Sequence, residues 1–214
     1  MTVQRTTVAP DRLATWAQAL GARLEGLHHD LDAEWRDEIM PAWAFADALT
    51  PAWARRVMPR LWAARLGGLP GLARMADPLA RLCLLPRTEV LSRLCTLAIA
   101  SRPGVLRCCI DREARAQMRA ALAESFEPLM EISRRGKPVD STVAGWSPVV
   151  WACIGWADWC AALSPADAAV RELVRLSLPR RMLDGLAGSL GVPTERPVPQ
   201  AIELLAEAGV EWPC

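Results

Sequence analysis

The sequence has no tyrosine, one lysine and two histidines, so it offers few groups for acid–base chemistry. The lysine is Lys137, and the two histidines, His28 and His29, are adjacent. Seven cysteines include no Cys-x-x-Cys pair, and an odd count with a vicinal pair, Cys108-Cys109, argues against a disulfide framework. A glycine-rich phosphate loop is also missing, because Gly67-Gly68 is not followed by Gly-Lys-Ser/Thr. These absences disfavour an enzyme.

A metal site is not predicted from these residues. Adjacent residues on a helix point about 100° apart, so His28 and His29 are not expected to share one ion. Cys153 and Cys160 lie in a tryptophan-rich apolar segment, which is typical of buried free thiols. A nucleophilic cysteine would need a histidine base, and nothing in the sequence places one beside a thiol. We therefore expect no catalytic residue, metal, cofactor or small-molecule substrate. An enzyme would become plausible only if His28 or His29 lay within hydrogen-bond reach of a thiol or carboxylate.

Long hydrophobic runs are missing as well. The best candidate, Val149–Ala157, is confined between Pro148 and Asp158, whereas a membrane span needs about 20 residues. The first ten residues, MTVQRTTVAP, contain no apolar core of signal-peptide length. We expect a cytoplasmic protein without direct membrane insertion.

The residues that are present predict an all-α protein. The chain has 214 residues, of which 52% are hydrophobic and 23% charged, enough apolar surface for a buried core. Stretches of alternating polarity are almost absent. Four pairs have the helix-start pattern of a polar cap followed by proline: Thr50-Pro51, Asp77-Pro78, Ser147-Pro148 and Ser164-Pro165. The fold class we predict is a single compact multi-helix domain with short connectors rich in proline and glycine.

The expected organisation has three parts. Residues 1–10 are interpreted as a disordered or frayed N-terminus, residues 11–190 as one α-helical domain, and residues 191–214 as a proline-rich linker with a short C-terminal helix. The polar loop 134–146 is a possible boundary within the domain. Pro59 is expected to kink or divide a helix at Trp53–Leu66. Two further helices are predicted at Ser164–Ser177 and Arg180–Leu190.

The central stretch, Leu85–Ile132, predicts a helix, a tight corner and a returning helix. Apolar residues recur at helical spacing at Val90, Leu91, Leu94, Leu97 and Ala98. Pro103 and Gly104 then end the helix. Asp111 is placed to cap a third segment, which we expect to continue with its apolar residues inward as far as Phe126.

Charge is distributed unevenly along the chain. Residues 55–119 carry thirteen arginines against four carboxylates, a net charge of +9, and each flank has a net charge of −4. Two interpretations stay open: the basic and acidic parts neutralise each other within the fold, or the arginines form a docking surface for an acidic protein. Arg112, Arg115 and Arg119 share one face of the predicted third segment, and Arg107 precedes it. A cluster of carboxylates in residues 30–38 is interpreted as a solvated helix face.

Nucleic-acid binding is disfavoured. Between Trp62 and Trp146 the single aromatic residue is Phe126, which leaves little for bases to stack on. The candidate turn Arg102–Gly104 is followed by an apolar segment, unlike a recognition helix.

The tryptophans near residue 150 also have two interpretations. Trp151, Trp156 and Trp159 lie on the same broad side of one predicted helix. Most residues of this kind fill a core, but indoles are also frequent anchors at interfaces. We therefore count these three, with Arg107, Arg112, Arg115 and Arg119, as candidate partner-binding residues.

The central motifs resemble those of the SctK-type family of bacterial type III secretion proteins, in its Hrp branch. The counterparts are Leu85-Pro86 before the leucine-rich Leu91–Leu94, the break at Arg102-Pro103-Gly104, and the step Arg107-Cys108-Cys109-Ile110-Asp111. A second Leu-Pro-Arg, at residues 178–180, is similar to the family's C-terminal signature. The resemblance implies a glycine near Ala123–Glu124, which this chain lacks.

This resemblance implies a non-enzymatic adaptor in the cytosolic sorting platform of an injectisome, peripheral to the inner-membrane base. Its partners would be the cytoplasmic domain of the inner-membrane ring protein and the pod-forming platform subunit. The competing interpretation is a secretion chaperone or helical regulator with a hydrophobic groove lined by Trp151, Trp156 and Trp159.

Overall fold

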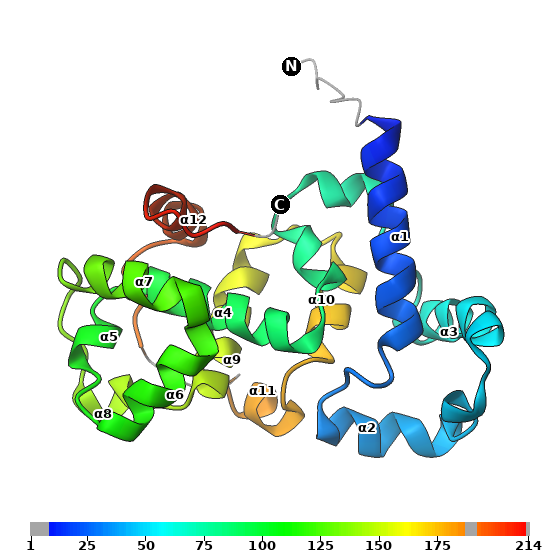
Figure 1. The fold of residues 1–214 in the computed structure, drawn as a ribbon, viewed down its shortest axis with the longest axis horizontal. Helices are drawn as coiled ribbons and strands as arrows, with labels where there is room; N and C mark the ends of the chain where they lie inside the picture. Colours follow the sequence, from blue (N-terminus) through cyan, green and yellow to red (C-terminus); the bar gives the residue numbers. More distant parts are fainter. Residues whose placement is uncertain (1–8, 187–191, 213–214) are drawn as a thin grey trace.

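The computed structural model describes residues 9–186 and 192–212, which form a helical protein (Figure 1). The α-helices are α1 (Pro10–Gly26), α2 (Ala33–Ile39), α3 (Pro51–Leu66), α4 (Arg87–Ser101), α5 (Val105–Cys108), α6 (Arg112–Leu122), α7 (Phe126–Ser133), α8 (Ser141–Ala144), α9 (Pro148–Ala162), α10 (Ala168–Arg175), α11 (Arg180–Leu186) and α12 (Val198–Glu207). The 3₁₀-helices are η1 (Met40–Trp43), η2 (Ala46–Ala48), η3 (Leu72–Ala76), η4 (Ala80–Leu84) and η5 (Ala123–Ser125). No strand occurs in these two ranges, and the predicted all-α class is confirmed.

Helices α4 and α9 form the centre of the molecule and make its most extensive helix–helix contact. Every residue from Leu94 to Ser101 of α4 is buried. Helix α9 is apolar on nearly all sides, as expected of a helix surrounded by protein. Gly155 allows the close approach, because a Cβ atom there would lie 1.9 Å from the carbonyl oxygen of Leu94.

The N-terminal helices pack against one side of this centre (Figure 1). Helix α1 buries Trp16, Leu20 and Leu24 and contacts α3. Asp32 caps α2, because its Oδ1 accepts the backbone N–H of Glu34 at 3.1 Å. Trp35 of α2 is anchored to the C-terminal half by a 2.9 Å hydrogen bond from its Nε1 to the carbonyl of Leu178.

Several predicted helix boundaries were wrong. Helix α3 continues through Pro59, so the division that was one of the two expected effects of this proline does not occur. Asp77-Pro78 starts a turn rather than an α-helix, since Asp77 Oδ1 accepts the N–H of Leu79 and η4 follows. Helix α10 begins at Ala168, three residues later than the Ser164-Pro165 pair suggested.

The returning helix of the central stretch is also interrupted. The predicted segment from Asp111 to Phe126 ends as α6 at Leu122, and α7 begins at Phe126. Ala123 lies between them with φ 46° and ψ −121°, a conformation that favours glycine. The loop 134–146 contains the short helix α8.

The proposed three-part organisation stays a prediction. Most of the segment expected to be frayed, residues 1–8, lies outside the described residues, as does the end of the predicted helix Arg180–Leu190. Helix α1 begins at Pro10.

Candidate interaction surfaces

Many arginines of the basic middle segment are bound to carboxylates of the acidic flanks. Arg74 donates from Nε and Nη2 to the two carboxylate oxygens of Asp167, both at 2.6 Å. Arg87 donates to Asp32 at 2.7 Å. Each pair joins segments far apart in the chain. For these residues the structure supports the interpretation that the basic and acidic parts of the chain neutralise each other within the fold.

The carboxylate cluster at residues 30–38 is therefore more than the predicted solvated face. Asp30 binds the buried guanidinium of Arg23, whose pKa is lowered by burial. Glu34 accepts the backbone N–H of Arg181 at 2.8 Å. Glu38 pairs with Arg65 and Arg180. These contacts connect α2 with α3 and α11.

The α6 arginines, predicted to share one face, have different environments. Asp111 caps α6 as predicted, because its Oδ1 accepts the N–H of Ala114 at 2.7 Å. Arg119 is engaged within the molecule: it pairs with Glu127 at 2.5 Å and its guanidinium lies 4.4 Å from the ring centroid of Phe126. Arg115 is half-buried against Met130 Sδ at 3.8 Å. Arg112 is exposed and has no hydrogen bond or ion pair within residues 9–186 and 192–212.

Arg107 has a local structural contact. Its backbone N–H donates to Ser133 Oγ at 2.8 Å, and its Nη2 donates to the carbonyl of Gly136 at 2.7 Å. The residue thereby ties α5 to the end of α7, although its side chain is still exposed. We name Arg107, Arg112, Arg115 and Arg119 the α6 surface.

A second arginine surface lies on α3 and was missed in the sequence. Arg55, Arg56 and Arg60 are exposed and have no carboxylate partner in the described part of the chain. Beside them Trp53 is 59% exposed. The side of the helix opposite Trp53, Arg56 and Arg60 buries Met58 and Trp62 against the core. The signal was available as an indole followed at i+3 and i+7 by arginines, and we name Trp53, Arg55, Arg56 and Arg60 the α3 surface.

The tryptophans of α9 belong to the core. Trp151 and Trp159 are fully buried, and Trp156 is half-buried. Trp159 Nε1 donates to the carbonyl of Leu79 at 3.1 Å, which satisfies its polar end in the interior. Trp151 and Trp159 offer no surface to a partner in this conformation. The core interpretation fits both residues.

The thiols are shielded, as expected. Burial raises the pKa of Cys83, Cys95, Cys153 and Cys160 to about 12. Burial also raises the pKa of Cys109. A thiol with so high a pKa carries almost no thiolate at neutral pH, so these cysteines lack the activation that nucleophiles need.

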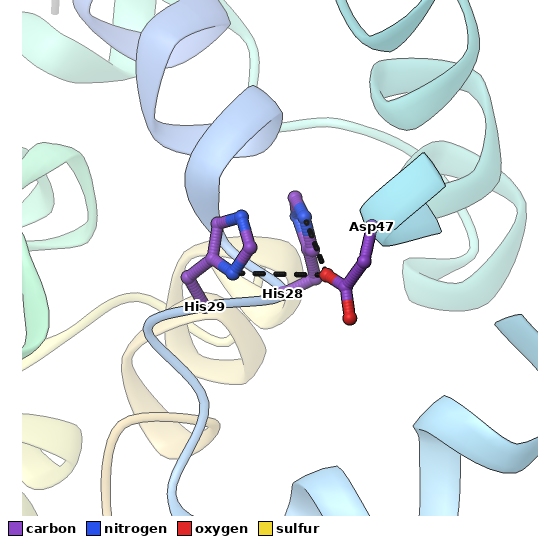
Figure 2. Close-up of side chains that lie close together, drawn as sticks. All are labelled: His28, His29 and Asp47. Carbon is purple, nitrogen blue, oxygen red and sulfur yellow. Dashed lines mark ion pairs between the residues drawn. The ribbon is translucent and has the colours of Figure 1, made fainter. Parts of the chain in front are cut away.

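The histidine pair lies where sequence reasoning did not expect it. His28 and His29 follow α1 in a turn rather than sharing a helix, and their ring centroids are 3.8 Å apart. Asp47 of η2 lies beside both (Figure 2). The angular argument against a shared ion therefore does not apply. Both nitrogens are farther than a hydrogen bond from Asp47 Oδ1, at 3.7 Å for His28 Nε2 and 3.8 Å for His29 Nδ1.

No described helix is both long enough and apolar enough to cross a membrane.

Comparison with known proteins gives the chain a family. No match was found among curated proteins or among solved structures. A family model described as bacterial type III secretion protein (HrpB4) matches residues 7–190, most of the chain and all of the central stretch whose motifs resemble this group. The chain belongs to the HrpB4 family of bacterial type III secretion proteins.

Proposed function

We propose that this secretion protein is a non-enzymatic cytoplasmic adaptor at the inner-membrane base of the injectisome. It links the cytoplasmic domain of the inner-membrane ring protein to the pod-forming subunit of the sorting platform. The observation that supports this role best is the position of the two arginine surfaces, because α6 and α3 lie toward opposite ends of the molecule's long axis (Figure 1). A linker needs two separate docking surfaces, and these two cannot be covered by one small partner.

The chemistry of both surfaces favours acidic partners. Arg112 on α6 and Arg55, Arg56 and Arg60 on α3 have no carboxylate partner within the described residues. Their positive charge is therefore available for complementary carboxylates, which would steer association and fix its orientation. The exposed indole of Trp53 adds the apolar contact that anchors many interfaces.

The experiment compares one variant of each surface. Arg112→Glu combined with Arg115→Gln alters the α6 surface and leaves Arg119, which is bound to Glu127, in place. Arg56→Glu combined with Arg60→Glu reverses charge on the α3 surface. Co-purification is measured separately with the ring protein's cytoplasmic domain and with the pod subunit. Each variant should lose one partner and keep the other.

A matched control is Arg12→Glu on α1, which reverses an exposed arginine outside both surfaces. It should bind both partners as the unchanged protein does. If both surface variants retain both partners, the adaptor surfaces proposed here are wrong. The chaperone alternative is disfavoured, because two of the three tryptophans that would line its groove, Trp151 and Trp159, are fully buried.

A further inference from the structure

His28, His29 and Asp47 place three metal-ligating side chains together at the junction between α1 and η2. The ligand atoms of all three residues lie within 4.8 Å of one another (Figure 2). The histidines come from the turn after α1 and the aspartate from η2, eighteen residues beyond His29. Neither the secretion function nor the arginine surfaces account for this arrangement.

The side chains of the three residues form few polar contacts within the described part of the protein. His28 is held against the protein, with its side chain 5% exposed and the backbone of Glu25 beside its ring. Its Nε2 atom has no hydrogen-bond partner in the described ranges, and buried polar atoms are almost always paired, so this nitrogen needs an explanation. Asp47 Oδ1 faces His28 Nε2 and His29 Nδ1 from beyond hydrogen-bond distance. A positive ion between His28 Nε2, His29 Nδ1 and the Asp47 carboxylate would pair these three ligand atoms.

The spacing fits a tetrahedral ion. Zinc–nitrogen and zinc–oxygen bonds of about 2.0–2.2 Å at tetrahedral angles separate neighbouring ligand atoms by about 3.4 Å. The observed 3.7 and 3.8 Å exceed this by a few tenths of an ångström. His29 is 68% exposed and Asp47 is 67% exposed, so both side chains have room to close that difference. Imidazole and carboxylate together suit Zn²⁺ and its neighbours Co²⁺ and Ni²⁺.

We propose that His28 Nε2, His29 Nδ1 and the Asp47 carboxylate bind one divalent transition-metal ion of the zinc type. Three protein ligands leave a fourth position open to water or to a group from a partner. The ion connects the turn that ends α1 to η2, the element that precedes α3. It therefore fixes the segment formed by α2, η1 and η2 at both of its ends. This site is independent of the proposed adaptor role.

His28 and His29 are the chain's two histidines, so any histidine ligand of a bound ion must be one of them. Zn²⁺ binding to the full-length protein is measured by isothermal titration calorimetry, and Co²⁺ binding by visible absorption. Wild type should bind one equivalent of Zn²⁺, and its unfolding temperature should rise with Zn²⁺. His29→Ala and Asp47→Asn should each weaken Zn²⁺ affinity at least about tenfold, because even outer-shell partners of a metal contribute that much. Both residues are exposed, so both variants should fold.

The matched control is Asp37→Asn, an exposed aspartate on α2 outside the cluster, which should leave Zn²⁺ affinity unchanged. The Co²⁺ spectrum should lack a thiolate-to-cobalt charge-transfer band, since the ligands are imidazole and carboxylate. The proposal is overturned if wild type binds no Zn²⁺, if His29→Ala binds it as tightly as wild type, or if the cobalt spectrum shows thiolate ligation.

Discussion

Arg102 and Asp158 form a two-bond ion pair that joins the ends of the two central helices. Arg102 donates from Nη1 and Nη2 to the carboxylate at 2.6 and 3.1 Å. The same guanidinium donates to the carbonyl of Val192 at 3.1 Å and to Thr194 Oγ1 at 2.8 Å. One side chain thus connects α4, α9 and the segment that leads to α12. The arginine that marked a helix stop in the sequence is a connector in the fold.

Breaking this pair should destabilise the protein strongly. Arg102 is 5% exposed and Asp158 is 13% exposed, so Asp158→Ala leaves a buried charge without its partner. We expect the free energy of unfolding to fall by about 3–5 kcal/mol. Urea denaturation followed by circular dichroism measures this loss. Arg102→Met combined with Asp158→Leu should cost less than Asp158→Ala alone, because no charge stays buried; a larger loss in the double variant would contradict the argument.

The contact of Gly155 with Leu94 predicts that a normally favourable substitution is harmful. Alanine in a helix is more stable than glycine by about 0.5–1 kcal/mol, yet a Cβ at position 155 would meet the Leu94 carbonyl oxygen at 1.9 Å. Gly155→Ala should therefore lower the free energy of unfolding by about 1–3 kcal/mol, the usual range for overpacking. Gly21→Ala is the matched control, since nothing lies within 4 Å of a Cβ there. In thermal denaturation it should raise stability slightly; equal effects at the two sites would refute the close approach.

Sequence patterns were sufficient for the fold class and for several helix positions. Apolar spacing predicted α4, and the Asp111 cap forms as expected. These features are local, because they depend on residues within a few positions. Asp167 shows where local reasoning ends: its carboxylate binds Arg74, ninety-three residues away, and does not cap α10.

The interaction surfaces and the histidine cluster depend more than the helices do on contacts between residues far apart in the sequence. Whether an arginine is free or paired follows from what folds against it, so Arg119 and Arg112 differ although both lie on α6. Trp151 and Trp159 could be core or interface until their burial was known. The histidine cluster needs a turn after α1 and Asp47 from another element. Spacing in the sequence predicts neither condition.

Ala123 has a backbone conformation that normally favours glycine. It is the single non-glycine residue with positive φ in the described ranges, and the resemblance leads us to expect a glycine near this position. Ala123→Gly should raise the free energy of unfolding by about 1 kcal/mol, because strain at the α6 end is relieved. Ala116→Gly, the same change at an exposed helical position, should lower it by about 0.5–1 kcal/mol. Chemical denaturation of both variants checks the opposite signs, and a loss at both positions would rule out strain at Ala123.

The buried thiols predict that stability decreases at alkaline pH. The pKa of Cys95 is raised to about 12 by burial, whereas an unfolded cysteine has a pKa of about 8.5–9. Between these values the unfolded state loses its proton and the folded state keeps it. The stabilisation is therefore complete below about pH 9 and decreases by about 1.4 kcal/mol per pH unit for each such thiol above it. The chain has no tyrosine and one lysine, so thiols dominate its titration in this range. Urea denaturation at pH 8, 9.5 and 10.5 should show the decrease, with a shallower slope in Cys95→Ala. An unchanged slope in that variant would mean that Cys95 is not the shielded thiol described here.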